Sequence, residues 1–155
     1  MKYQLQNLTE EERQLVLDAP ILVAILIGGS DNDFDEQEIT RTIELINTKT
    51  FSETADLREL YTELDKASEE RLMTLCDNLP EDVLVREKQV SERLAKLNEV
   101  FPKMERKYSL HFYNSLKDFA VHIANSSGSA FGTDNISDHE KDLLALKMLK
   151  KPDVA

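Results

Sequence analysis

The run Pro20-Ile21-Leu22-Val23-Ala24-Ile25-Leu26-Ile27-Gly28-Gly29 decides the fold class, because it suits two different structures. As a buried strand followed by a glycine turn and a helix, it would indicate a nucleotide-binding α/β fold. As a helix that is apolar on every side, it would be the centre of a helical bundle. No other segment has a strand pattern, and a single strand has nothing to pair with. We therefore predict a helix from Thr9 to Gly28, opened by a capping box between Thr9 and Glu12, with Pro20 starting its regular part or kinking it.

The rest of the chain supports an all-α fold. Four glycines and four prolines in 155 residues are too few for a turn-rich β fold, and 41% apolar residues supply one core. We predict a compact bundle of about seven helices in a single domain, 1–155, with flexible ends at about 1–8 and 151–155. The apolar stripes at helical spacing are Ile39, Ile43 and Ile46; Leu57, Leu60, Tyr61 and Leu64; Leu72, Leu75, Cys76 and Leu79; Val83, Val90, Leu94, Leu97 and Phe101; Tyr108, Phe112, Leu116, Phe119 and Ile123; and Leu143, Leu144, Leu146 and Leu149.

The charge of the chain limits its partners. Thirty acidic residues against 19 basic ones give a net charge of -11. Such a field repels phosphate backbones and anionic lipid, so we expect neither nucleic-acid binding nor direct membrane insertion. Cations, or another protein with a basic surface, are better candidates. The single cysteine, Cys76, the lack of a signal-peptide pattern and the lack of an apolar run of about 18 residues predict a cytoplasmic protein.

Two acidic junctions form an internal repeat of a helix, an acidic turn and a second helix. The first runs from Gly29 to Glu38 and the second from Ala130 to Glu140. Helix capping alone explains Asp35-x-x-Glu38 and Ser137-x-x-Glu140, but it leaves the acids before each cap unexplained. Hard cations such as Ca²⁺ bind several flexible oxygen ligands of this kind. The candidate metal ligands are Asp31, Asp33, Asp35 and Glu38 in the first junction, and Asp134, Asp138 and Glu140 in the second.

The first junction is not an EF-hand. Its aspartates match positions 1, 3 and 5 of that loop, but Glu36 stands where glycine is needed and Thr42 where the bidentate glutamate is needed.

The junctions do resemble those of the tellurite-resistance TerB-like family, whose motif is Asp-Gly-x-apolar-(Ser/Asp)-x-x-Glu. Asp31 to Glu38 fits this motif with Asn32 in place of glycine. The late copy matches at Ile136, Ser137 and Glu140 but departs from it at Thr133 and Asp134. The resemblance implies an all-helical cytosolic protein that binds a divalent cation such as calcium and serves as a stress-linked adaptor. It leaves open whether the two junctions share one cation.

The rival hypothesis is an acidic helical interaction module without a metal site. An enzyme is the weaker interpretation, because the sequence has no Ser/His/Asp spacing, phosphate loop or zinc motif. Cys76 falls on a leucine stripe and is expected to be a small buried apolar residue. His111 and His122 are eleven residues apart, about 16 Å along a helix, too far to bind one metal. His139 lies in the second junction, where we expect it to face solvent.

Overall fold

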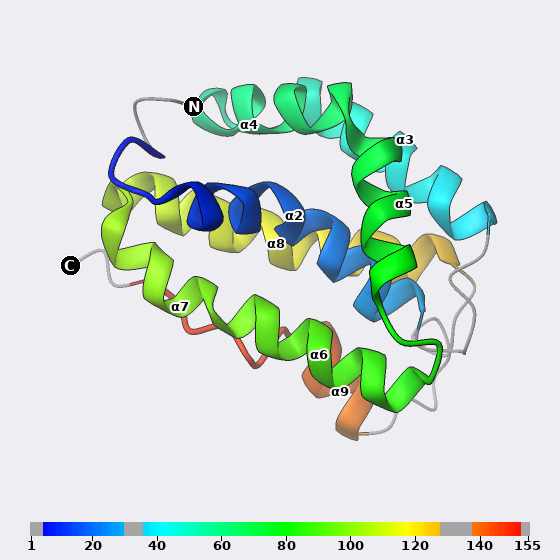
Figure 1. Ribbon diagram of the computed structural model, residues 1–155. Helices are drawn as coiled ribbons and strands as arrows, with labels where there is room; N and C mark the ends of the chain where they lie inside the picture. The colour runs from blue at the N-terminus through cyan, green and yellow to red at the C-terminus, as the bar shows by residue number, and fades with distance from the viewer. Residues whose placement is uncertain (1–4, 30–35, 128–137, 153–155) are drawn as a thin grey trace.

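The computed structural model describes residues 5–29, 36–127 and 138–152, and they contain helices and no strand. The one-turn α7 continues α6 after a break. With these two counted as one, the described residues hold the expected seven helices, which confirms the all-α bundle. The elements are α2 (Glu10–Gly28), α3 (Glu36–Ser52), α4 (Ala55–Lys66), α5 (Ser68–Asn78), α6 (Val83–Ala95), α7 (Leu97–Val100), the 3-10 turn η1 (Phe101–Lys103), α8 (Arg106–Ser127) and α9 (Asp138–Leu144) (Figure 1).

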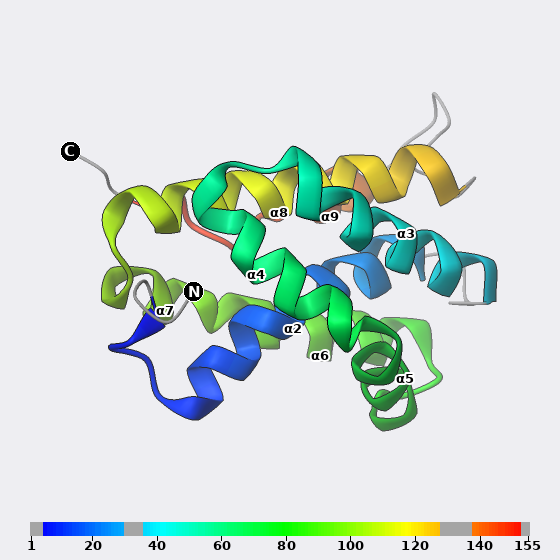
Figure 2. The ribbon, with the colours of Figure 1, turned by 90° about the horizontal axis from the view of Figure 1, so that it is seen from above.

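Helix α2 is the centre of the bundle, and every residue from Val16 to Gly28 is buried. It packs mainly against α8 and α6 (Figures 1 and 2). The predicted helix and its capping box are confirmed, since Glu12 N–H donates to the Thr9 hydroxyl and Thr9 N–H to the Glu12 carboxylate. Pro20, however, lies inside the helix, so the prediction that it starts the regular part is wrong. Its missing N–H removes one backbone bond, and burial on every side holds the helix together across it.

Most residues of the predicted apolar stripes join the core, although Ile43 and Val83 are only partly buried and lie outside it. All four stripe residues of α4 and all five of α8 are buried. The Phe101 ring meets the Phe112 and Tyr113 rings edge to face, with centroids 6.4 Å apart in each pair. Leu5 and Leu8, within the end that was expected to be flexible, are also buried in the core. No helix in the described ranges combines the length and apolarity needed to cross a bilayer.

The last helix is shorter than its leucine spacing predicts. We expected it to reach Leu149, but α9 ends at Leu144. Leu146 has a φ of 51°, and the N–H groups of Leu146 and Lys147 donate to the carbonyls of Leu143 and Asp142. This is the Schellman pattern that ends a helix, with leucine where glycine is usual. Burial of the Leu146 side chain offsets the free-energy cost of its left-handed backbone. The turn redirects residues 147–152 across the bundle.

Candidate functional site

Three of the four described helix ends beside the two acidic junctions share one end of the bundle, and the start of α9 lies apart from them (Figure 1). The end of α2, the start of α3 and the end of α8 lie together there in both ribbon views (Figures 1 and 2). The predicted ligands Asp31, Asp33, Asp35 and Asp134 lie outside the described residues. Asp138 and Glu140 belong to the first turn of α9, where the backbone alone is described. Ile136 and Ser137, which match the late copy of the motif, likewise lie outside the described residues.

Glu38 is the predicted metal ligand whose surroundings the structure gives. It lies in the first turn of α3 with its side chain only 10% exposed. Its Oε1 is 3.4 Å from Nη1 of Arg41, and its carbonyl accepts the Thr42 hydroxyl at 2.8 Å. Glu38 is therefore a nearly buried carboxylate with a cationic partner one turn away. Within the described ranges, no three His, Cys, Asp or Glu side chains are grouped so that they could hold a metal ion.

An arginine fixes the chain where it enters the first junction. Nη2 of Arg86, on α6, donates to the Gly29 carbonyl at 2.8 Å, and the Gly29 N–H donates to the Ile25 carbonyl at 2.9 Å. The carbonyls at a helix C-terminus carry partial negative charge, so a guanidinium there stabilises the helix end. The last turn of α2 is therefore tied to α6 directly before the acidic run begins.

Gly29 has no room for a side chain, and Gly29→Ala should lower the free energy of unfolding by about 1 to 2 kcal/mol. A Cβ there would lie 2.6 Å from the Ile25 carbonyl oxygen and 3.0 Å from Nη2 of Arg86. The arginine tip can move aside, but the backbone oxygen cannot. Urea denaturation measures the loss. The same loss should persist in an Arg86→Met background; a loss confined to the Arg86 protein would show that the side chain, not the backbone, sets the limit.

A polar network that the sequence analysis missed joins α3, α4 and α8. We name it the Lys49 network, and its members are Lys49, Glu53, Tyr61, Ser115 and Asp118. The Lys49 ammonium, with its side chain 6% exposed, lies 2.8 Å from Glu53 Oε1 and also contacts Asp118. The Ser115 hydroxyl donates to Glu53 at 2.7 Å, and the Tyr61 hydroxyl lies 2.7 Å from Ser115 Oγ. Because Ser115 gives its only proton to Glu53, Tyr61 is the donor in that second bond.

The charges and hydrogen bonds of the Lys49 network stabilise the packing of its helices and do not favour proton transfer. Burial raises the pKa of Tyr61 far above its usual range, so its hydroxyl stays protonated. Beside the network, His111 Nδ1 is 2.7 Å from Asp56. Burial alone would raise the pKa of Asp56, but hydrogen bonds from Thr54 and His111 outweigh it and lower that pKa. These groups hold three helices together through charge-assisted hydrogen bonds.

A second missed cluster ties the central helix to its neighbours. Asp18 lies on α2 and is only 8% exposed. Its Oδ1 accepts from Nη1 of Arg71 on α5 at 2.7 Å, and its Oδ2 is 3.5 Å from Nη2 of Arg93 on α6. We call these three residues the Asp18 cluster. The carboxylate lies in the buried part of α2, two residues before the apolar run that decides the fold, where a charge is stable only with partners.

The lone cysteine is less buried than the sequence predicted. Cys76 is half-buried, and burial raises the pKa of its thiol. His111 and His122 lie at the edge and on the surface of the bundle, with side chains 29% and 56% exposed. No protein-family model, curated protein or solved structure matches this chain. The likeness to the TerB-like family therefore stays a prediction from the two junctions.

Proposed function

We propose that this protein is a cytoplasmic, non-catalytic helical adaptor of the TerB-like kind, which binds a divalent cation at its acidic junctions. The observation that carries the proposal is the shared position of the helix ends. The chain enters both junctions, and leaves the first, at one end of the bundle (Figures 1 and 2). The chain therefore enters the two junctions, about a hundred residues apart in sequence, from neighbouring helix ends.

The charges of the chain favour a hard cation as the ligand. Seven carboxylates are proposed as ligands in a protein of net charge -11, and Ca²⁺ takes six to eight oxygen ligands in flexible arrangements. Glu38, held almost out of solvent at the start of α3, would be the innermost of these oxygens. Binding there would require Arg41 to release it. The Lys49 network, largely buried apart from Asp118 and occupied by its own hydrogen bonds, supports the non-catalytic part of the proposal.

Calorimetry with calcium on chelator-treated protein tests the metal site. We expect saturable binding, and we expect Asp31→Asn to weaken it at least tenfold because the change deletes one charged ligand. Asp35→Ser should weaken calcium binding as well while keeping most of the helix stability, since serine caps a helix about as well as aspartate. Asp77→Asn, at an exposed position of α5, is the matched control and should leave affinity unchanged. If Asp31→Asn binds calcium as the parent does, the first junction is only a helix start.

A second candidate function, recruitment of a basic partner without a metal, is favoured by the start of α6. Leu84 is 74% exposed and Val85 46%, and both follow the exposed acids Glu81 and Asp82. An apolar pair beside carboxylates suits a basic amphipathic helix. Titration with a lysine- and leucine-rich helical peptide should show binding that Leu84→Ser weakens and that added salt weakens further. If neither Leu84→Ser nor added salt weakens peptide binding, this second candidate function is rejected.

A further inference from the structure

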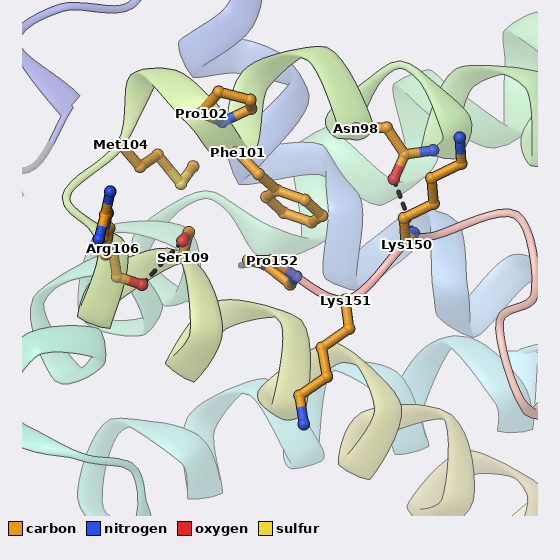
Figure 3. Close-up of a pocket in the computed structure, with 9 residues that line it drawn as sticks. All are labelled: Asn98, Phe101, Pro102, Met104, Arg106, Ser109, Lys150, Lys151 and Pro152. Carbon is orange, nitrogen blue, oxygen red and sulfur yellow. Dashed lines mark hydrogen bonds between the residues drawn. The ribbon is translucent and has the colours of Figure 1, made fainter. Parts of the chain in front are cut away.

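The structure contains a cavity of about 360 Å³. In contrast to the acidic junctions, the charged residues that line it are basic. It lies where η1 and the start of α8 face the last described residues of the chain (Figure 3). Its volume falls in the range of small-molecule sites. The nine residues that line it are Asn98, Phe101, Pro102, Met104, Arg106, Ser109, Lys150, Lys151 and Pro152.

One wall of the cavity is held in place by a side-chain clamp. Asn98 Nδ2 donates to the Met148 carbonyl at 2.8 Å, and Asn98 Oδ1 accepts from the Lys150 N–H at 2.8 Å. The left-handed turn at Leu146 sends the chain toward this clamp. These two bonds between the Asn98 side chain and the backbone fix residues 148–150 against α7. The wall therefore does not depend on the conformations of the lysine side chains.

The charge of the lining is opposite to that of the protein. Three of the nine lining residues are basic and none is acidic, although 30 of the 155 residues in the chain are acidic. Arg106, Lys150 and Lys151 lie on three sides of the apolar centre in Figure 3. The nearby Glu105 is occupied, because its carboxylate oxygens accept the N–H groups of Lys107 and Tyr108. Their side chains leave this centre in different directions, so an anion at the rim would meet one lysine at a time (Figure 3).

The floor of the cavity is apolar. Phe101 and Met104 line it and are only 4% and 6% exposed, so both are fixed in the core. Pro102 and Pro152 add rigid apolar surface on either side. The Ser109 hydroxyl donates to the Arg106 carbonyl at 2.8 Å. Its oxygen can still accept a hydrogen bond on that side of the cavity. An apolar body on this floor would bring an attached anionic group within reach of the long basic side chains at the rim.

We propose that this cavity binds a small organic anion with an apolar body, such as a short acyl or aryl carboxylate or phosphate. The apolar part packs against Phe101, Met104 and Pro152. The anionic group binds at the rim, to Lys150 or Lys151. The site is independent of the acidic junctions, so it stands or falls separately from calcium binding.

Competition against a fluorescent probe tests this ligand class in the intact chain, with chelator present. The probe is 8-anilinonaphthalene-1-sulfonate, an aromatic anion, and we expect it to bind saturably to the folded protein. Octanoate or octyl phosphate should displace it, and comparison of the two distinguishes carboxylate from phosphate. Octylammonium, with the same tail and the opposite charge, should be at least tenfold weaker, and inorganic phosphate should not compete. Equal competition by octylammonium, or no saturable probe binding, would overturn the proposal.

Charge reversal locates the site. The double change Lys150→Glu and Lys151→Glu should weaken probe binding at least tenfold. The matched control Lys66→Glu and Lys88→Glu alters the net charge equally at exposed positions of α4 and α6, and it should leave affinity within about twofold of the parent. Amide shifts on adding octanoate should centre on Ser109 and Met104. An equal loss in both double variants would mean that only net charge matters, and would reject the cavity as the site.

Discussion

Lys49→Met is expected to lower the free energy of unfolding by about 3 kcal/mol, because it removes one partner of a buried ion pair. Methionine has a similar length and an apolar stem, so little packing is lost. What changes is the charge 2.8 Å from Glu53, whose side chain is only 12% exposed. Glu53 would keep the hydrogen bond from Ser115 but lose its cation. Urea denaturation followed by circular dichroism measures the difference.

Two further variants separate charge from packing at this position. Lys107→Met removes an exposed lysine from α8 and should change stability by less than about 0.5 kcal/mol. Adding Glu53→Gln to Lys49→Met should restore more than half of the loss, because the amide oxygen still accepts from Ser115 and no unpaired charge remains. If the double variant is as unstable as Lys49→Met alone, the loss comes from packing, and the ion pair is not its cause.

Asp18→Asn should lower the free energy of unfolding by about 2 to 3 kcal/mol, the second largest effect expected here. The substitution keeps the shape of the side chain but leaves Arg71 and Arg93 without their shared anion. The loss is smaller than for a fully buried pair, because Arg93 is 39% exposed and reaches water. Thermal and urea denaturation of the variant measure it.

The two arginines of the Asp18 cluster should contribute unequally. Arg71 is 2.7 Å from Asp18 and 23% exposed, whereas Arg93 is 3.5 Å away and more exposed. Arg71→Gln should therefore cost more stability than Arg93→Gln, which we expect to cost less than about 1 kcal/mol. Asp77→Asn on α5 serves as the surface control. The reverse order of the two arginine variants would contradict this account of the cluster.

The fold could be predicted from the sequence because its strongest signals are local. The run Ile21–Ile27 had no strand to pair with, so its apolar surface had to be covered by helices. The stripes of α4 and α8 follow from 3.6-residue periodicity alone. The end of α9 could not be predicted in this way. Leu146 continues the leucine spacing, yet it adopts a left-handed backbone that favours glycine and is stabilised by burial of its side chain.

The polar clusters could not be predicted, because their members are far apart in sequence. Lys49 and Asp118 are separated by 69 residues, and Asp18 and Arg93 by 75. Periodicity gave one usable signal: Lys49 follows Thr42 and Ile46 on the buried face of α3, which predicts a buried lysine that needs a partner. It does not identify the partner. For the acidic junctions the reverse holds. The residue types proposed as ligands can be read from the sequence, whereas the geometry that would bring them together depends on the tertiary structure.

The position of α2 has a consequence for the newly made chain. Helix α2 is synthesised before the helices that cover it, α6 and α8, which end as much as 99 residues later. At ordinary rates of translation this delay is about 5 to 20 seconds. Throughout that interval a segment apolar on every side has no native surface to bury against. Of the described helices, α2 is thus the one that a holdase chaperone should bind on the ribosome.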